Sequence, residues 1–233
     1  RVARVRPTTS TFNTLISACA RDAAWAQALA FLKQIEEEGL TPDEWSYNAA
    51  MDACAKAHQW EEALRLYEDM QRARIAPTTV TYTTLINACG RAGEWEHAMQ
   101  LFEQMKAAGI KRNEWTYSAL INACSKGKQL PLALELHRSM LDEGIPSNTV
   151  TFNILIGACE KCLEWKLALQ IYEDMKAAEV EPDDHTYNAL ISACSQGGQV
   201  ETSMKLFEEM KEAGLCANTR TYAALMKGAR LMG

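Results

Sequence analysis

The chain has 233 residues, of which 48% are hydrophobic and only six are prolines, and this composition excludes a collagen-like or low-complexity polymer. No apolar run approaches the roughly 20 residues that a membrane helix requires, so we expect no membrane partner. The formal net charge of -6 argues mildly against nucleic acid, because phosphate binding favours a basic excess.

A repeat of 35 residues runs along the whole chain, with copies such as SACARDAAWAQAL, DACAKAHQWEEAL and NACGRAGEWEHAM. The predicted boundaries are 1-8 for the end of a preceding unit, 9-43, 44-78, 79-113, 114-148, 149-183 and 184-218 for six full units, and 219-233 for the first helix of a seventh. Because the chain begins at Arg1 and the last unit is cut, we treat it as a fragment of a longer protein.

Each unit predicts two helices. The first helix is expected to begin at a Ser or Thr whose hydroxyl caps free backbone N–H groups. These residues are Thr11, Ser46, Thr81, Thr116, Thr151, Thr186 and Thr221. The second helix should end at a glycine in the left-handed conformation, as at Gly39, Gly109, Gly144 and Gly214. Arg74 and Glu179 take that place in the second and fifth units, so we expect less sharply terminated helices there.

No unit can bury its apolar stripe alone, so neighbouring units must stack. A column of small residues lets the second helix approach the first closely, at Ala28, Ala63, Ala98, Ala133, Ala168 and Ser203. The expected fold is therefore an all-α, right-handed superhelical α-solenoid of helix-turn-helix repeats, with an inner groove lined by the first helices.

The cysteines follow the repeat and do not indicate a metal site. Six occupy the eleventh position of a unit, where a small buried apolar residue is expected: Cys19, Cys54, Cys89, Cys124, Cys159 and Cys194. Cys159 and Cys162 form a C-x-x-C, but no second ligand pair accompanies it. The four histidines fall at four different repeat positions. We therefore expect no metal and no cofactor.

The unit length, the sequence VTYTTLINACGRAGEWEHAMQLFEQMKAAGI and its copies, and the endings Pro42-Asp43 and Pro182-Asp183 closely resemble the pentatricopeptide repeat family. The uniform unit length resembles its P class. The resemblance implies binding of single-stranded RNA along the inner groove, with one base per repeat. It also implies a role in stabilising, processing or translating transcripts of a chloroplast or mitochondrion.

The family reads each base with the fifth and the last residue of a unit. The corresponding pairs are Asn13 with Asp43, Asn48 with Thr78, Thr83 with Asn113, Ser118 with Asn148, Asn153 with Asp183, and Asn188 with Asn218. By the family's pairing rules, Asn with Asp favours U, Thr or Ser with Asn favours A, and Asn with Asn or Thr favours a pyrimidine (Y). The resemblance thus predicts the target 5′-U-Y-A-A-U-Y-3′.

The family also clamps each base between second-position side chains of adjacent units, here Ser10, Trp45, Val80, Trp115, Val150, His185 and Arg220. The usual residue is a small aliphatic one, so Trp45 and Trp115 depart from the pattern and offer larger stacking faces, worth about 1 to 3 kcal/mol per base. Ser10 should clamp weakly, and Arg220 is suited to stacking its guanidinium or contacting phosphate.

A cation recurs at the thirteenth position and answers the objection from net charge. The expected phosphate-binding residues are Arg21, Lys56, Arg91, Lys126 and Lys161, whereas the sixth unit has Gln196. The acidic excess collects in the second helices, which should form the outer surface. The helix dipole also favours a cation at a helix end, but it does not require one in every unit.

Every candidate catalytic residue belongs to a repeat column, so we expect no catalysis and no small-molecule substrate in this segment. A catalytic domain, further repeats or protein partners could lie outside the fragment. The alternative function is a protein- or peptide-binding scaffold, because helical arrays offer concave surfaces to proteins. A repeated polar reader, clamp and cation suit a polymer of repeated phosphates better than a peptide.

Overall fold

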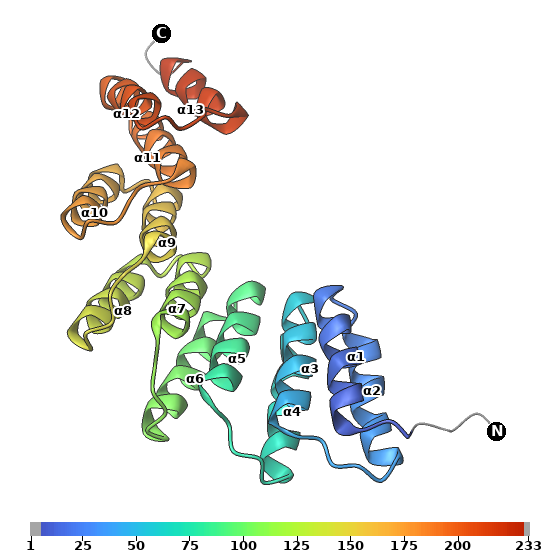
Figure 1. Cartoon of the computed structure of the whole chain (residues 1–233). Helices are drawn as coiled ribbons and strands as arrows, with labels where there is room; N and C mark the ends of the chain where they lie inside the picture. Colours follow the sequence, from blue (N-terminus) through green and yellow to red (C-terminus); the bar gives the residue numbers. More distant parts are fainter. Residues whose placement is uncertain (1–5, 231–233) are drawn as a thin grey trace. The chain divides into compact units, whose positions relative to one another are not determined.

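The structure is a computed structural model that describes residues 6–230, and every regular element in this range is an α-helix (Figure 1). The predicted all-α helical repeat is thereby confirmed. The outermost parts of the first and last predicted units, residues 1–5 and 231–233, lie outside the described residues.

Two helices alternate along the chain, as the repeat predicts. The first helices of the units, called helices A, are α1 (Thr9–Arg21), α3 (Glu44–Lys56), α5 (Thr79–Ala92), α7 (Glu114–Lys126), α9 (Thr149–Lys161), α11 (Asp184–Gln196) and α13 (Thr219–Arg230). The second helices, called helices B, are α2 (Trp25–Glu37), α4 (Trp60–Arg72), α6 (Trp95–Ala107), α8 (Leu130–Asp142), α10 (Trp165–Ala177) and α12 (Val200–Glu212).

The helices form two compact units, residues 1–123 and 124–233. In the first unit, α1 packs against α3 and α3 against α5, and each of these helices also packs against the helix B that follows it (Figure 1). In the second unit, α11 packs against both α9 and α13. Stacked helices A therefore build each unit. The right-handed sense of a superhelix stays a prediction.

Helix A begins two residues earlier than the Ser and Thr column predicts. The N-cap is the last residue of the preceding unit, as at Asp43, whose Oδ1 accepts from Ser46 N at 2.9 Å. Ser46 lies one turn inside the helix, and its hydroxyl accepts from Asp43 N at 3.1 Å. This reciprocal capping box recurs at Thr78 with Thr81 and at Asp183 with Thr186. The hydroxyl column thus closes the cap instead of forming it.

The prediction of less sharply terminated helices at Arg74 and Glu179 is wrong. Both residues have a φ of 57°, in the left-handed region that Gly109 also adopts at 66°. The chain then closes with the same hydrogen bond, from Ile75 N to Met70 O at 3.0 Å after α4. This hydrogen bond, which closes the end of the helix, offsets the steric cost of a side chain in this conformation, about 1 kcal/mol.

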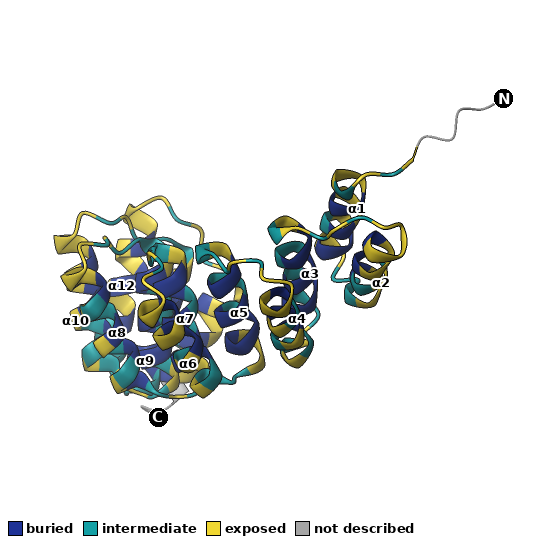
Figure 2. Ribbon diagram, turned by 90° about the horizontal axis from the view of Figure 1, so that it is seen from below, coloured by how far each residue is buried: buried dark blue, intermediate teal, exposed yellow. Residues whose placement is uncertain are grey.

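The core follows the repeat columns (Figure 2). The small-residue column and the cysteine column are buried throughout, and burial raises the pKa of the Cys54, Cys89 and Cys159 thiols to about 12. The fourth-position aromatics are also buried from Phe12 to Tyr187, but Tyr222 is 52% exposed, because its unit has no helix B to cover it within the described residues.

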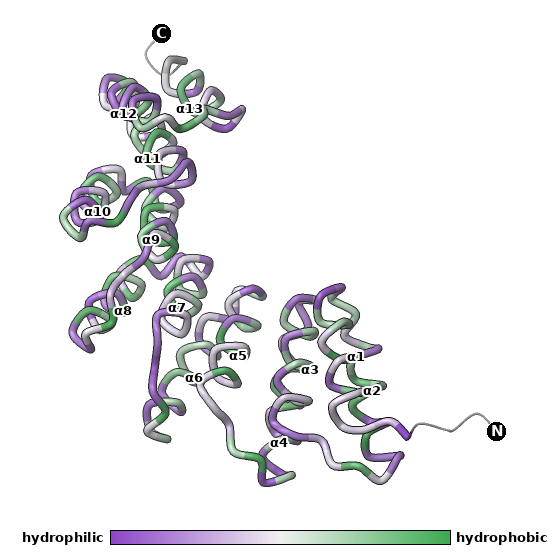
Figure 3. Tube along the Cα trace, viewed as in Figure 1, coloured by the Kyte–Doolittle hydropathy of each residue, from purple (hydrophilic) through white to green (hydrophobic). Residues whose placement is uncertain are grey.

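Hydrophilic residues collect in the connections and on the helices B. Figure 3 shows this for residues 111–113, the end of the connection between α6 and α7. Helices B carry more acidic than basic residues, whereas helices A carry more basic than acidic ones. The net negative charge of the chain therefore does not describe the helices A.

Candidate nucleic-acid interface

The helices A present the predicted clamp residues to solvent. All seven second-position side chains are exposed, including the two indoles, with Trp45 66% and Trp115 63% exposed. Exposed tryptophans and valines in register have no packing role in the repeat, since the core uses other columns. Their exposure leaves them available to a ligand.

The predicted readers of the first and fifth units share one hydrogen-bond geometry. Asn13 Nδ2 donates to both carboxylate oxygens of Asp43, at 3.1 and 3.3 Å, and Asn13 Oδ1 accepts from Ser46 Oγ at 2.6 Å. In the fifth unit, Asn153 Nδ2 donates to Asp183 at 2.9 and 3.1 Å, and Asn153 Oδ1 accepts from the hydroxyl of the next unit at 2.6 Å. Each asparagine amide is therefore fixed in orientation.

Hydrogen bonds also lower the pKa of the two reader aspartates. Burial opposes ionisation of the Asp43 carboxyl, but hydrogen bonds from Ser46 and Asn13 outweigh it and hold the pKa below the usual value. At Asp183, burial likewise opposes ionisation, whereas bonds from Thr186 and Asn153 lower the pKa. Both carboxylates are ionised at neutral pH and act as hydrogen-bond acceptors.

Three of the remaining readers contact the same hydroxyl column but have no aspartate partner. Asn48 Oδ1 accepts from Thr81 Oγ1 at 2.8 Å, and Asn188 Oδ1 accepts from Thr221 Oγ1 at 2.5 Å. Thr83 Oγ1 lies 3.0 Å from the hydroxyl of the next unit. The partner residues Asn113, Asn148 and Asn218 each accept from the backbone of the following helix A.

The structure adds two kinds of residue that the sequence reasoning missed. The hydroxyl at the third position of the following unit orients five of the predicted readers, and its regular spacing could have indicated this. Glu44 joins the second pair, because its Oε1 accepts from Asn48 Nδ2 at 3.2 Å and from Thr78 Oγ1 at 2.8 Å. The first position holds Thr9, Thr79 and Thr149 in other units, so the repeat gave no consistent signal for this role.

The fourth predicted pair is divided between the two compact units. Ser118 lies in the first unit, where it is 7% exposed, and Asn148 lies in the second, where it caps α9. The clamp residues Trp115 and Val150 are divided in the same way. We therefore describe each of these residues only by its contacts and exposure within its own compact unit.

A cavity of about 570 Å³ lies between the first two clamp residues, Ser10 and Trp45. The first reader pair, Asn13 and Asp43, lines it, and so does Arg21. The residues predicted to clamp, read and neutralise the first nucleotide thus surround one space. We call the space between consecutive second-position side chains a base slot, and this one, between Ser10 and Trp45, is the first slot.

A second cavity of about 430 Å³ occupies the second slot, between Trp45 and Val80. Asn48 and Lys56 line it. Trp45 borders both cavities, and its Nε1 donates to Ser17 Oγ at 3.4 Å, which orients the ring. The Trp45 indole can therefore stack with one flat ligand on each of its two faces.

The thirteenth-position cations lie where the repeat predicts, at the last turns of the helices A. Arg21, Arg91, Lys126 and Lys161 are exposed, whereas Lys56 is half-buried and pairs with Asp52 at 2.7 Å. Their role toward phosphate stays a prediction. No group of three or more His, Cys, Asp or Glu residues that could hold a metal is found in residues 6–230.

Comparison with known proteins connects this geometry to a family. The model of the PPR repeat family matches residues 7–56, 45–91, 77–126, 117–161, 147–196 and 185–230. A comparison with curated proteins finds no match. No helix in the described part of the chain is both long and apolar enough to cross a membrane.

Solved structures show the same fold. The pentatricopeptide repeat protein PPR10 from maize is 27% identical over 98% of this chain and 38% of its own, with a TM-score of 0.63. PPR10 in complex with an 18-nt psaJ RNA element is 26% identical over 94% of this chain and 36% of its own, with a TM-score of 0.70. The chain thus spans less than two-fifths of PPR10.

A more distant structure, the PPR domain of Arabidopsis thaliana protein-only RNase P 1 in complex with tRNA, is 18% identical over 77% of this chain and 95% of its own. Its TM-score is 0.67, and at this identity the likeness shows the fold alone. The matches of the family model cover nearly all of the described residues, in register with the helices A and B. The chain therefore belongs to the PPR repeat family.

Proposed function

We propose that this chain binds single-stranded RNA along its helices A and takes one base per repeat. The observation that carries the proposal is the pair of cavities on the two sides of Trp45. Each cavity is lined by two clamp residues, by the reader of its unit and by a cation. A flat apolar face, a directed amide and a cation are the groups that a nucleotide's base, base edge and phosphate require.

The orientation of the readers supports base selection. Asn13 and Asn153 have both ends of their amides fixed by neighbouring side chains, so each presents a defined pattern to a ligand. A preorganised amide discriminates between bases because a wrong base leaves a buried polar group unpaired. The proposed target is 5′-U-Y-A-A-U-Y-3′, from the pairing rules of the family.

The similarity to PPR10, whose structure holds an RNA element, supports RNA as the ligand class. We further propose that binding involves no chemistry by this segment, because its groove residues belong to repeat columns that orient and neutralise a ligand. By the family resemblance, the expected setting is a chloroplast or mitochondrion, where occupancy of a transcript protects it, aids its processing or changes its translation. Targeting of the whole protein fused to a fluorescent reporter tests the location.

The first test is fluorescence anisotropy with a labelled RNA that contains UCAAUC, its scrambled counterpart and the matching DNA. We expect tighter binding to the predicted RNA, with a log-log salt slope of about 3 to 4 from up to five cations at about 0.7 each. Binding without preference would reject the base assignments. A folded monomer that binds no RNA would reject the proposal and favour a protein-binding scaffold.

A further inference from the structure

Three residues of the fifth to seventh units depart from their repeat columns. At the twelfth position, Glu160 is the only acidic residue in a column that otherwise contains Ala20, Ala55, Gly90, Ser125, Ser195 and Arg230. At the thirteenth position, Gln196 replaces the cation of the five preceding units. At the second position, Arg220 is the only basic residue apart from His185.

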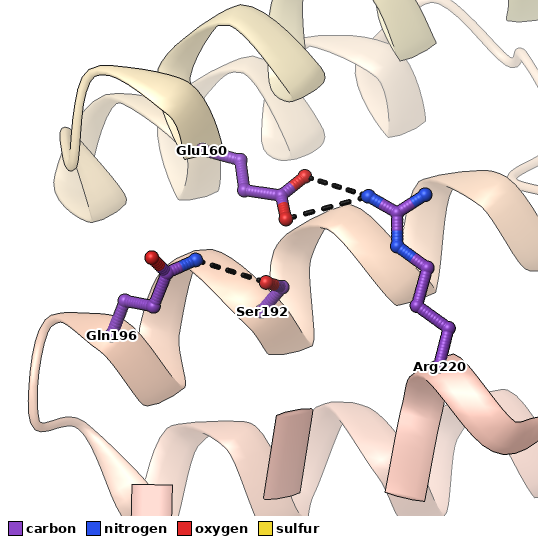
Figure 4. Close-up of polar contacts among 4 residues, drawn as sticks. All are labelled: Glu160, Ser192, Gln196 and Arg220. Atoms are coloured by element: carbon purple, nitrogen blue, oxygen red, sulfur yellow. Dashed lines mark hydrogen bonds and ion pairs between the residues drawn. The ribbon is translucent and has the colours of Figure 1, made fainter. Parts of the chain in front are cut away.

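The structure brings these departures to one place (Figure 4). Arg220 Nη2 lies 3.1 Å from Glu160 Oε2 and 3.4 Å from Glu160 Oε1. The pair joins α13 to α9 and passes over α11, which lies between them and carries Gln196. The amide of Gln196 is engaged on its own helix, where Nε2 donates to Ser192 Oγ at 3.0 Å.

Neither charge stabilises its own helix. Arg220 lies in the first turn of α13, where the helix dipole disfavours a cation, and Glu160 lies in the last turn of α9, where it disfavours an anion. The Glu160 side chain is 15% exposed and that of Arg220 is 60% exposed. The carboxylate is thus largely covered, whereas the guanidinium remains accessible to an incoming anion.

The pair lies at the sixth slot, between His185 and Arg220. The reader of this slot, Asn188, is 2% exposed, which is the lowest value among the six fifth-position readers. The first slot, by contrast, opens into a cavity. A nucleotide at the sixth slot would have to meet Arg220, and the slot has no thirteenth-position cation of its own.

We propose that Arg220 is the phosphate ligand of the sixth slot and that Glu160 holds it until RNA displaces the carboxylate. The inference rests on the proposed function. The Glu160 carboxylate occupies the guanidinium as a phosphate oxygen would, since the guanidinium donates to carboxylate and phosphate oxygens alike. Arg220 thereby takes the place of the thirteenth-position cation, which the sixth unit lacks because it has Gln196. Because RNA must displace Glu160 from Arg220, binding at the last base is weaker than at the first.

Displacement of Glu160 from Arg220 by RNA has a measurable consequence that simple charge repulsion by Glu160 does not have. If RNA must break the Arg220–Glu160 pair, removing Glu160 helps binding more when Arg220 is present than when it is absent. If Glu160 only repels phosphate, removing it helps equally in both cases. A pair that only joins α9 to α13 would change thermal stability and leave RNA affinity unchanged.

The experiment measures RNA affinity by anisotropy for the wild type, Glu160→Gln, Arg220→Gln and the double variant. The probe is an RNA with UCAAUC at its centre and one further nucleotide at each end. We expect Glu160→Gln to tighten binding about threefold, in line with an exposed ion pair, and by less than about 1.5-fold when Arg220 is also replaced. Arg220→Gln should weaken binding most, about fivefold, in the Glu160→Gln background.

The matched control is Glu173→Gln, which removes the same charge from the same repeat. Glu173 lies on the helix B α10 and pairs with Lys176 at 2.6 Å. We expect its RNA affinity to equal that of the wild type, and circular dichroism melting to show that every variant is folded.

Equal gains from Glu160→Gln with and without Arg220, or no gain at all, would overturn the displacement of Glu160 by RNA while RNA binding by the wild type upheld the proposed function. Absence of RNA binding by the folded wild type would overturn both. The wild-type measurement therefore separates the two failures.

Discussion

The first and sixth slots share one side-chain hydrogen bond at the reader but differ in the residues that surround it. In both, a fifth-position asparagine accepts from the hydroxyl of the next unit, Ser46 or Thr221. The first slot opens into a cavity of about 570 Å³ beside Trp45, whereas the sixth is bordered by Arg220, whose guanidinium is engaged by Glu160. The hydrogen bond to the next unit fixes the orientation of the reader. The clamp residue and its neighbours determine how accessible the slot is.

This difference has a physical origin. The readers are oriented by contacts between adjacent units, and these contacts repeat because the same residue types recur. The clamp residues are exposed, so packing places no constraint on them and they vary from Ser10 to Trp45 to Arg220. Variation at exposed positions therefore changes slots individually without changing the fold.

The largest expected effect is on the first slot, which opens into a cavity beside Trp45. Trp45→Ala should weaken binding of the UCAAUC RNA by about 30-fold or more, because the indole borders two slots and each base stack contributes about 1 to 3 kcal/mol. Anisotropy measures the change. Since Trp45 is 66% exposed, the melting temperature should stay near that of the wild type.

Trp45→Phe provides the control, because it keeps a flat face and loses only the bond to Ser17. It should retain most of the affinity. Equal losses in the Ala and Phe variants would contradict stacking as the role of Trp45.

The next effect concerns base choice at the two slots. The double change Asn13→Ser with Asp43→Asn recreates the pair of the fourth unit and keeps an N-cap residue for α3. We expect the first base preference to change from U to A by about tenfold, as expected for loss of a directed polar contact. Binding to RNAs that differ only at the first base measures it.

The matching change at the sixth slot is Asn188→Ser, since Asn218 already stands in the partner position. It should alter the last base preference less than the first-slot variant alters the first, because the slot is less open. An equal or larger change at the sixth slot would contradict the comparison.

A smaller effect separates stability from binding. Arg74→Gly should raise the free energy of unfolding by about 0.5 to 1 kcal/mol, because glycine adopts the left-handed conformation without steric cost. Gly109→Ala should lower it by a similar amount, since φ is 66° and an added Cβ meets no atom within 4 Å. Urea unfolding measures both changes.

Neither variant should alter RNA affinity, because both turns follow helices B and lie outside the slots. A change in affinity that follows stability would show that the slots respond to the stability of the whole array and not to their own residues.

The smallest effect is a flat pH profile at the first slot. The pKa of Asp43 is lowered by hydrogen bonds that outweigh burial, so its bonds are fully present above the ordinary aspartate value of about 3.9 and are lost only as pH falls through the lowered one. The preference for U at the first base should therefore not change between about pH 5 and 8. Anisotropy in buffers of constant ionic strength measures it, and loss of the preference within this window would contradict an ionised reader.

Much of the fold and of the candidate site could be predicted from the sequence. The repeat period, the alternating helices, and the buried cysteine and alanine columns followed from spacing alone, because each unit presents the same apolar stripe to the next. The family resemblance named the readers and clamps. The structure gathers several of them, including Asn13, Asp43 and Trp45, around one cavity.

The predictions from the sequence were wrong where two neighbouring groups compete for the same hydrogen bond or the same helix end. The hydroxyl column suggested N-caps, but the preceding residue, such as Asp43, takes that role and leaves Ser46 to orient Asn13. Arg74 suggested a frayed end, but the hydrogen bond from Ile75 N to Met70 O closes the helix with Arg74 in the left-handed conformation. Which of two adjacent groups wins such a competition depends on three-dimensional contacts.

The sequence by itself determined the repeat, its core and the chemical type of each groove column, because these follow from periodic burial along one chain. Only the tertiary structure decided how the irregular positions combine, since Glu160 and Arg220 are 60 residues apart and meet because α9 and α13 both pack against α11. Spacing within one unit carries no information about a contact that skips a unit, so this pair required the stacked helices to become visible.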